Sequence, residues 1–314
     1  MNIVISLMDL FWNKIVRKQD DARIATLKEP EGVKQVCGMR YLEGENPMHL
    51  LDVYYPEDVK EKLPVIIDIH GGGWMYGDKE LNKMYCLSLA KRGFVVFNIS
   101  YRLVPEVTVG VQLQDCAHAM KWISENMDEY PCDKEHIMLT GDSAGGMLSA
   151  YTAALMSSEE LREIFDTVDP KMNLTALTLT SPVAYMNEKG VMSLYTKLMW
   201  GENWSSLKTA PYMNLDSLFE KASFPPTAFV TSSGDAIALE QTRRAAEDFR
   251  KHGIETKFIE FDTFEGKDLE HVFAVLLPDS KAGKVCIDSY INFYRNHMKT
   301  AVKLHGLTLW RKKL

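Results

Sequence analysis

From residue 50 onward, short apolar runs alternate with stretches in which apolar residues recur at helical spacing. This alternation predicts an α/β fold with a mostly parallel central sheet flanked by helices. Several runs, such as Val65-Ile66-Ile67, are continuously apolar, as strands covered on both faces must be. We expect strands at residues 50–54, 65–69, 95–99, 137–139, 176–180, 227–231 and 257–261. Helices are expected at residues 82–92, 112–127, 146–157, 240–251 and 284–299.

Residues 183–225 interrupt this alternation of strands and helices, but the segment is not rich in Ser or Gly as a flexible linker would be. We interpret this segment as an insertion that forms a lid over one edge of the sheet and lines a ligand pocket. The alternative is that its aromatic rings pack as a local core. The rings belong to Tyr185, Tyr195, Trp200, Trp204, Tyr212 and Phe219.

The N-terminal residues also show helical spacing, which predicts a second cap or lid helix, with contact to a membrane interface as the alternative. Because Asp9 interrupts the apolar run and no basic residue precedes it, neither a signal peptide nor a membrane span is predicted. We therefore expect one domain over residues 1–314, with cap elements at about 1–45 and 183–225. The apolar stripe comprises Val4, Met8, Phe11 and Ile15, widened by Ile3, Leu7 and Leu10.

The segment Gly141-Asp142-Ser143-Ala144-Gly145 lies between an expected strand and an expected helix. In a G-x-S-x-G elbow the turn is so tight that only glycine fits at the flanking positions, and the serine hydroxyl is exposed above the sheet. The N-terminus of the following helix favours developing negative charge. Ser143 is therefore the predicted nucleophile.

A second glycine-rich segment, His70-Gly71-Gly72-Gly73-Trp74, directly follows the strand expected at residues 65–69. Its backbone N–H groups have no side chain to block a carbonyl oxygen, which is what an oxyanion hole requires. We expect the oxyanion donors to be the N–H groups of Gly72, Gly73 and Ala144.

If the chain follows the order nucleophile, acid, histidine that is typical of α/β-hydrolases, the base must lie beyond Ser143. His252 stands at an apparent helix end, His297 within the terminal helix pattern, and His305 in the basic tail. His271 alone follows the last expected strand through an irregular loop, so it is the predicted base.

The acid that orients this histidine should follow the penultimate strand, where Ser232-Ser233-Gly234 leads into Asp235. Glu240, Asp262 and Asp268 are the competing acids. Asp142 precedes the nucleophile and is expected to brace neighbouring loops rather than to react.

Together these motifs resemble the hormone-sensitive lipase-like esterases, also called the GDXG family, and the resemblance runs from about residue 50 to residue 297. It implies an α/β-hydrolase fold with a helical cap, hydrolysis of carboxylic esters with short acyl chains, and the roles assigned above to Ser143, His271, Asp235, Gly72, Gly73 and Ala144. It also implies that His70 and residues 101–106 are structural braces, with an ion pair between Arg102 and Glu106. The motifs are His70-Gly71-Gly72-Gly73-Trp74, Tyr101-Arg102-Leu103-Val104-Pro105-Glu106, Gly141-Asp142-Ser143-Ala144-Gly145-Gly146, Asp235 and His271.

The chain departs from the family pattern at two places. After Asp235 the family commonly has Pro-Leu and a second acid, whereas this chain has Ala236-Ile237-Ala238-Leu239, so the local support of Asp235 is expected to differ. The loop before His271, residues 264–270, is longer and more acidic than is usual. Such a loop would favour a cationic or polar leaving group.

Composition limits the partners. With 36 basic and 43 acidic residues the net charge is −7, which gives no general attraction to nucleic acid or to an anionic membrane. The basic tail, residues 299–314, is expected to be a solvated or frayed end, with a surface-binding arm as the alternative. The five cysteines are scattered without a C-x-x-C pair, so neither a disulfide framework nor a zinc site is predicted. They are Cys37, Cys86, Cys116, Cys132 and Cys286.

These features predict a cytoplasmic serine carboxylesterase that hydrolyses short- to medium-chain esters through an acyl-enzyme, without a metal or an organic cofactor. An arylformamidase acting on a formamide is the first alternative, and a long-chain lipase is another. A ligand receptor built on an inactive hydrolase is the third, and the retained His271 argues against it. A homodimer formed through an exposed edge strand is compatible with the fold.

Overall fold

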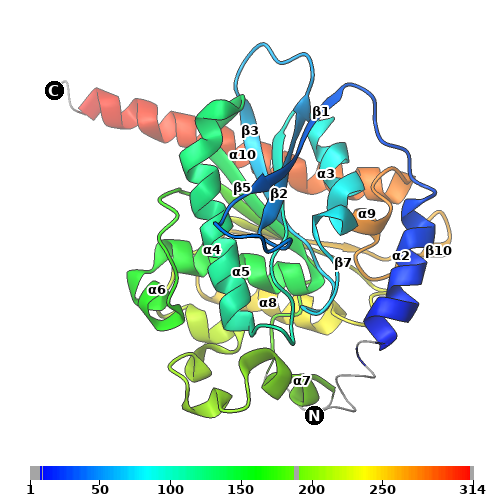
Figure 1. Ribbon diagram of the computed structural model, residues 1–314. Coiled ribbons are helices and arrows are strands. Elements are labelled where there is room, and N and C mark those ends of the chain that lie inside the picture. Colours follow the sequence, from blue (N-terminus) through cyan, green and yellow to red (C-terminus); the bar gives the residue numbers. More distant parts are fainter. Residues whose placement is uncertain (1–7, 9, 187–190, 312–314) are drawn as a thin grey trace.

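The structure is a computed structural model that describes residues 8, 10–186 and 191–311, and its centre is an eight-stranded sheet (Figure 1). The strand order is β1-β2-β4-β3-β5-β6-β7-β8. The β1–β2 and β2–β4 pairs are antiparallel and all other neighbours in this sheet are parallel, which confirms the predicted fold class. The strands are β1 (Val33–Arg40), β2 (Leu50–Pro56), β3 (Leu63–Ile69), β4 (Val95–Ile99), β5 (Cys132–Asp142), β6 (Ala176–Thr180), β7 (Thr227–Ser232) and β8 (Thr256–Phe261).

Helices cover both faces of the sheet (Figure 1). One face packs against α4 (Val109–Asn126), α5 (Ser143–Ser157) and α8 (Leu239–Lys251), and the other against α3 (Lys83–Ala90), α9 (Phe273–Leu276) and α10 (Lys281–Arg311). Strand β3 contributes to both hydrophobic cores, because Val65, Ile67 and Ile69 lie in the first and Ile66 in the second. This two-sided burial explains why the run is apolar without interruption.

The seven expected strands correspond to β2 through β8, but the edge strand β1 was not predicted. Lys34, Gln35 and Arg40 interrupt its apolar positions, as is common in a strand with one exposed face. Residues 33–40 pair with β2 in the sheet, so assigning them to an N-terminal cap over residues 1–45 was wrong. Residues 263–264 and 267–268 form a separate hairpin, β9 (Thr263–Phe264) and β10 (Lys267–Asp268).

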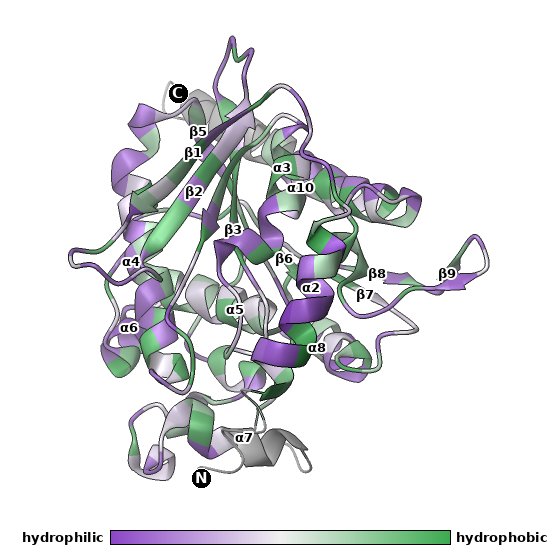
Figure 2. Cartoon of the chain, turned by 45° about the vertical axis from the view of Figure 1, so that its right-hand side comes forward, coloured by the Kyte–Doolittle hydropathy of each residue, from purple (hydrophilic) through white to green (hydrophobic). Residues whose placement is uncertain are grey.

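The predicted N-terminal stripe is only partly buried. Leu10, Phe11 and Ile15 are 52%, 48% and 50% exposed, whereas Met8 is buried and Trp12 packs against the core. Residues 11–16 form a π-helix, η1 (Phe11–Val16), in which the α-helical spacing used for the prediction does not apply. The following α2 (Arg17–Ile24) is mostly hydrophilic (Figure 2). Val4, Ile3 and Leu7 lie outside the described residues.

The insertion contains α7 (Val191–Trp200) and the short 3₁₀ helices η4 (Trp204–Ser206), η5 (Ala210–Tyr212) and η6 (Leu215–Leu218). Several of its rings pack on helices of the main body. The rings of Trp200 and Tyr212 lie 6.4 and 6.5 Å from that of Phe165 in α6 (Glu159–Phe165), and Phe219 lies 5.1 Å from Phe249 in α8. For these rings the contacts favour the local-core interpretation over a substrate pocket.

Other expectations concern the termini and the cysteines. The helix α10 extends to Arg311, beyond its expected end at residue 299, so most of the basic tail is helical rather than frayed. All five cysteines are free, and Cys37 alone among them is exposed. Among the described residues, no helix has the length and hydropathy needed to cross a membrane, and no cluster of three potential metal ligands occurs.

Candidate active site

The sharp turn at Ser143 joins the end of β5 to the start of α5. Ser143 has a left-handed φ of 52°, a conformation that costs a non-glycine residue about 1–3 kcal/mol and that persists only when the surroundings enforce it. The neighbouring glycines enforce it by close packing. A Cβ at Gly141 would collide with the carbonyl of Gly145, and one at Gly145 would collide with the carbonyls of Ile69 and His70. The G-x-S-x-G spacing is therefore a steric requirement of this turn.

His271 and Asp235 are brought together from two different loops at the carboxyl edge of the sheet. His271 Nδ1 lies 2.9 Å from Asp235 Oδ1. Asp235 is almost fully buried, and the same oxygen accepts the backbone N–H groups of Ile237 and Ala238 at 3.0 and 2.9 Å. Burial opposes ionisation, but the hydrogen bond and charge of His271 together with the Ala238 N–H lower the pKa of Asp235 to about 2. The carboxylate is thus ionised and able to orient the imidazole.

The residues after Asp235, where the sequence departs from the family pattern, support its carboxylate through their backbone. The segment Ala236-Ile237-Ala238-Leu239 folds back so that the backbone N–H groups of Ile237 and Ala238 bind the carboxylate. Thr231 adds a hydroxyl 3.3 Å from the second carboxylate oxygen.

The competing histidines and acids have other partners. His252 Nδ1 bonds the carbonyl of Asp248, and its ring stacks on Phe219 with centroids 4.1 Å apart. His297 Nε2 lies 3.0 Å from Glu255, and the side chain of His305 lies outside the described residues. The competing acids are also engaged, since Glu240 pairs with Arg243 and Asp262 accepts the Ser233 hydroxyl, while Asp268 lies in the exposed hairpin strand β10.

The glycine loop after β3 adopts backbone conformations that favour glycine. Gly72 and Gly73 have φ values of 100° and 58°. A Cβ at Gly72 would collide with the Tyr76 carbonyl, which also shows how tightly this turn is closed. The backbone N–H groups of Met75 and Tyr76 donate to the Gly72 carbonyl at 3.2 and 3.0 Å.

His70 lies beneath this loop and acts as a structural brace. Its ring is fully buried, stacks on Tyr101 with centroids 4.4 Å apart, and bonds the Gly71 carbonyl through Nδ1 at 2.8 Å. Burial lowers the pKa of His70 to about 4, so the ring is neutral at neutral pH. The Tyr101 hydroxyl donates to the His70 carbonyl at 2.8 Å. A neutral imidazole with its proton on Nδ1 can therefore donate to Gly71 and fix the loop.

Asp142 links the glycine loop to the elbow. One of its carboxylate oxygens accepts the Gly71 N–H at 3.1 Å, and a Cβ at Gly71 would lie only 2.5 Å from the other oxygen. Asp142 is buried, and its place next to Ser143 fits the bracing role expected from the sequence.

The expected ion pair between Arg102 and Glu106 is wrong. Arg102 instead forms a two-pronged ion pair with the buried Asp115 of α4, with Nε to Oδ2 at 2.9 Å and Nη2 to Oδ1 at 2.6 Å, while Glu106 is exposed. A buried acid with two oxygens matched to the guanidinium fork is the stronger partner.

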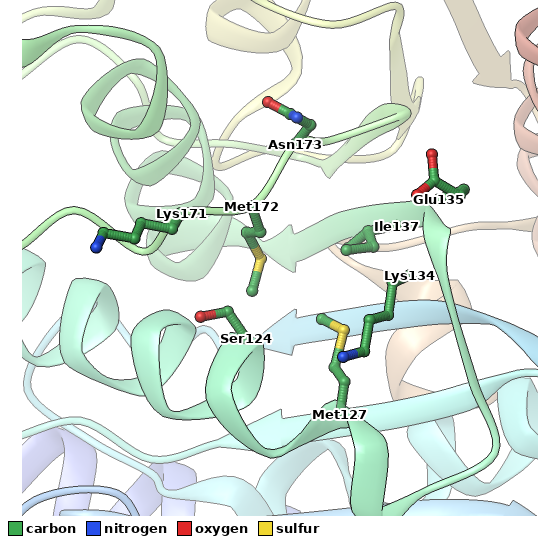
Figure 3. A pocket seen from close by; sticks show the side chains of 8 residues that line it. All are labelled: Ser124, Met127, Lys134, Glu135, Ile137, Lys171, Met172 and Asn173. Atoms are coloured by element: carbon green, nitrogen blue, oxygen red, sulfur yellow. The ribbon is translucent and has the colours of Figure 1, made fainter. Parts of the chain in front are cut away.

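One cavity of the protein lies away from Ser143. It has a volume of about 240 Å³ and is lined by residues from the start of β5, the end of α4 and residues 171–173 (Figure 3). Its lining residues are Ser124, Met127, Lys134, Glu135, Ile137, Lys171, Met172 and Asn173. Ser143 directly follows the opposite end of β5. The cavity is therefore separate from the catalytic edge.

Comparison with known proteins supports this arrangement. The family model BD-FAE matches residues 51–199, which include the glycine loop and Ser143. Esterase LipC from Mycobacterium tuberculosis is 35% identical over 133 residues, which is 38% of this chain but only a third (33%) of LipC. The structure of esterase B from Lactobacillus rhamnosis is similar over nearly the whole length, with 27% identity, a TM-score of 0.92, and coverage of 97% of this chain and 98% of that one.

The same fold occurs in an esterase structure described as bacterial hormone-sensitive lipase family, with a TM-score of 0.69, 20% identity and 90% coverage of each chain. This chain has the α/β-hydrolase fold and is similar to known esterases of that fold. The resemblance drawn from the motifs is thereby confirmed.

One residue beside the candidate site could not be predicted from the sequence. Trp12 lies against Gly73, where a Cβ would collide with its indole, and it stacks on Tyr76 with centroids 5.8 Å apart. The only sequence signal was the four-residue spacing from Met8 to Trp12. The N-terminal segment thus contacts the loop that carries the expected oxyanion donors.

Proposed function

We propose that this protein is a serine carboxylesterase that hydrolyses short- to medium-chain carboxylic esters through an acyl-enzyme intermediate. The observation that carries the proposal is the 2.9 Å hydrogen bond between His271 and Asp235 at the sheet edge where Ser143 stands on a strained elbow. The glycine loop beside this elbow supports the assignment of Gly72, Gly73 and Ala144 as oxyanion donors.

In the proposed mechanism, His271 Nε2 accepts the proton of the Ser143 hydroxyl as the oxygen attacks the ester carbonyl. The three backbone N–H groups stabilise the negative oxygen of the tetrahedral intermediate. The intermediate collapses, the bond to the alcohol breaks, and His271 delivers its proton to the leaving oxygen. Water then attacks the acyl-enzyme with the same histidine as base, which releases the acid and restores Ser143.

Preference for short acyl chains is supported by one relative. Esterase B, which is similar over nearly the whole chain, is described with a C4–C4 sn3 tributyrin phosphonate inhibitor. For this protein we expect kcat/KM on p-nitrophenyl esters to be greatest for short chains and to fall beyond roughly C8, because an acyl site fitted to a short chain gains no binding energy from additional methylenes. A series from acetate to palmitate at fixed enzyme concentration measures this. Activity that rises with chain length and increases above the solubility limit of the ester would contradict it and favour a long-chain lipase.

The formamidase alternative needs a direct comparison. Under the esterase proposal, p-nitrophenyl butyrate is hydrolysed with a higher kcat/KM than N-formylkynurenine. The reverse order would assign the same site to formamide hydrolysis.

We further propose a cytoplasmic location. Support comes from the five free cysteines, including the exposed Cys37, because a reducing compartment keeps such thiols reduced.

A further inference from the structure

The side chain of Asn82 connects two buried carboxyl groups at the base of the site. Its Nδ2 group donates to Asp68 Oδ2 at 2.9 Å and to Asp142 Oδ1 at 2.8 Å. All three side chains are essentially buried, with 2%, 0% and 5% exposure for Asn82, Asp68 and Asp142. Asp68 lies in β3 and Asp142 at the end of β5, so one amide joins the two strands that lead into the glycine loop and the elbow (Figure 1).

The Asp68–Asn82–Asp142 hydrogen bonds are called the bridge. The turn that carries Asn82 is fixed by other hydrogen bonds. Asn82 ends the 3₁₀ helix η2 (Lys79–Asn82), whose first backbone N–H groups are accepted by Ser100 Oγ at 3.0 Å and by Asp78 Oδ1 at 2.8 Å. Asn98 donates to the Lys79 carbonyl at 2.6 Å. The amide of Asn82 is therefore presented from a rigid support.

The bridge reaches the reacting groups through Asp142 alone. The same Oδ1 that accepts from Asn82 also accepts the N–H of Gly71, the residue before the expected oxyanion donors Gly72 and Gly73. On its other side Asp142 is bonded in sequence to Ser143. Movement of this carboxylate would displace both the nucleophile and the donors, which act only at about 2.7–3.1 Å from the oxyanion.

The Asn82 amide also acts on the ionisation of the two acids. Burial and the nearby Asp142 raise the pKa of Asp68 to about 8, so Asp68 is protonated at neutral pH. Burial raises the pKa of Asp142 as well, and the hydrogen bond from Asn82 opposes this rise by stabilising the carboxylate.

We propose that Asn82 and Asp68 are positioning residues for ester hydrolysis. They hold the Asp142 carboxylate so that the glycine loop after β3 and Ser143 keep the relative positions that the reaction requires. This inference rests on the proposed esterase function. It predicts that loss of the bridge lowers kcat much more than it raises KM, because the oxyanion donors act mainly in the transition state.

The first test is Asn82→Ala with p-nitrophenyl butyrate. We expect kcat to fall about 10- to 100-fold, less than on loss of a donor itself, with KM changed by less than about threefold. The rate of covalent labelling by a tributyrin phosphonate should fall in parallel. The matched control is Ser88→Ala in α3, which removes a buried hydrogen bond to the Tyr85 carbonyl without touching the bridge. A kcat for Asn82→Ala equal to that of Ser88→Ala at similar Tm would overturn the proposal.

The variants of Asp68 test the bridge if Asn82→Ala does not fold. Asp68→Asn keeps an oxygen that can accept from Asn82 and mimics the protonated acid, so it should retain most of the turnover that Asp68→Leu loses. Equal kcat values for these two variants would contradict the proposal.

A double-mutant cycle tests the route through Asp142. If Asn82 acts through that carboxylate, Asn82→Ala adds little to the loss in kcat already caused by Asp142→Asn. Additive losses would overturn this route. Failure of the wild-type protein to cleave any ester or to react with the phosphonate would instead count against the proposed function.

Discussion

Replacing Ser143 by alanine is expected to lower kcat for p-nitrophenyl butyrate by about 10⁴- to 10⁶-fold, the range seen when a triad serine is removed. The residual rate would come from binding and the oxyanion donors acting on water. The fold should survive, because the left-handed backbone at residue 143 is enforced by the packing of Gly141 and Gly145 and not by the serine hydroxyl. Tm should therefore stay close to that of the wild type.

Ser149→Ala is the matched control for this measurement. Ser149 lies in the same helix α5, is fully buried, and donates to the Thr140 carbonyl at 3.0 Å. Its loss removes a hydrogen bond near the elbow but no proposed nucleophile, so turnover should remain near wild type. Mass spectrometry after phosphonate treatment should place the adduct on the peptide that contains Ser143. Wild-type turnover by Ser143→Ala, or an adduct on a different residue, would rule out the proposed nucleophile.

The fold could be predicted because strands covered on both faces are apolar at every position. Val65, Ile66 and Ile67 fill two different cores, and such a run is visible in the sequence. Strand β1 could not be found in this way. Polar residues such as Lys34 stand between its apolar residues, so the strand contains no continuous apolar run. The α-helical spacing likewise failed at η1, where the π-helical turn places Trp12 inward and Ile15 outward.

At the candidate site, the base and the acid could be predicted from their order along the chain, and the structure places these two residues in contact. His271 and Asp235 each follow a strand of a parallel sheet, and the carboxyl ends of such strands meet at one edge. Side-chain partners that depend on packing between distant helices could not be predicted. Arg102 pairs with Asp115 because α4 lies against that loop, and Asn82 reaches Asp142 across 60 residues of sequence.

Replacing Asp235 by asparagine is expected to lower kcat by about 10⁴-fold with little change in KM, as for the corresponding acid of other serine hydrolases. The introduced side chain can still accept the N–H groups of Ile237 and Ala238 through its amide oxygen, so the loop should remain folded. That oxygen takes the place of Oδ1, so it can also accept from His271 Nδ1, and the substitution removes the negative charge rather than this hydrogen bond. The imidazolium formed during attack then loses its compensating charge.

The same substitution should change the dependence of stability on pH. Asp235 has a folded pKa of about 2, below that of an ordinary carboxyl. Its contribution to the free energy of unfolding is therefore complete above the unfolded pKa and is lost as the pH falls toward 2. Urea denaturation of Asp235→Asn at pH 5 and pH 3 should show a smaller loss of stability than the wild type. An equal loss in both proteins would mean that Asp235 is not held in the ionised form by His271.

The activity of Asp262→Asn tests whether Asp235 or Asp262 is the acid that orients His271. Asp262 was the competing candidate after β8, and its carboxylate accepts the Ser233 hydroxyl at 2.7 Å at the surface of the protein. Because that hydrogen bond lies outside the His271–Asp235 pair, its loss should leave kcat within about twofold of wild type, as is usual for surface substitutions. If Asp262→Asn lost activity while Asp235→Asn retained it, the orienting acid would be Asp262, and the 2.9 Å contact of His271 with Asp235 would be structural only.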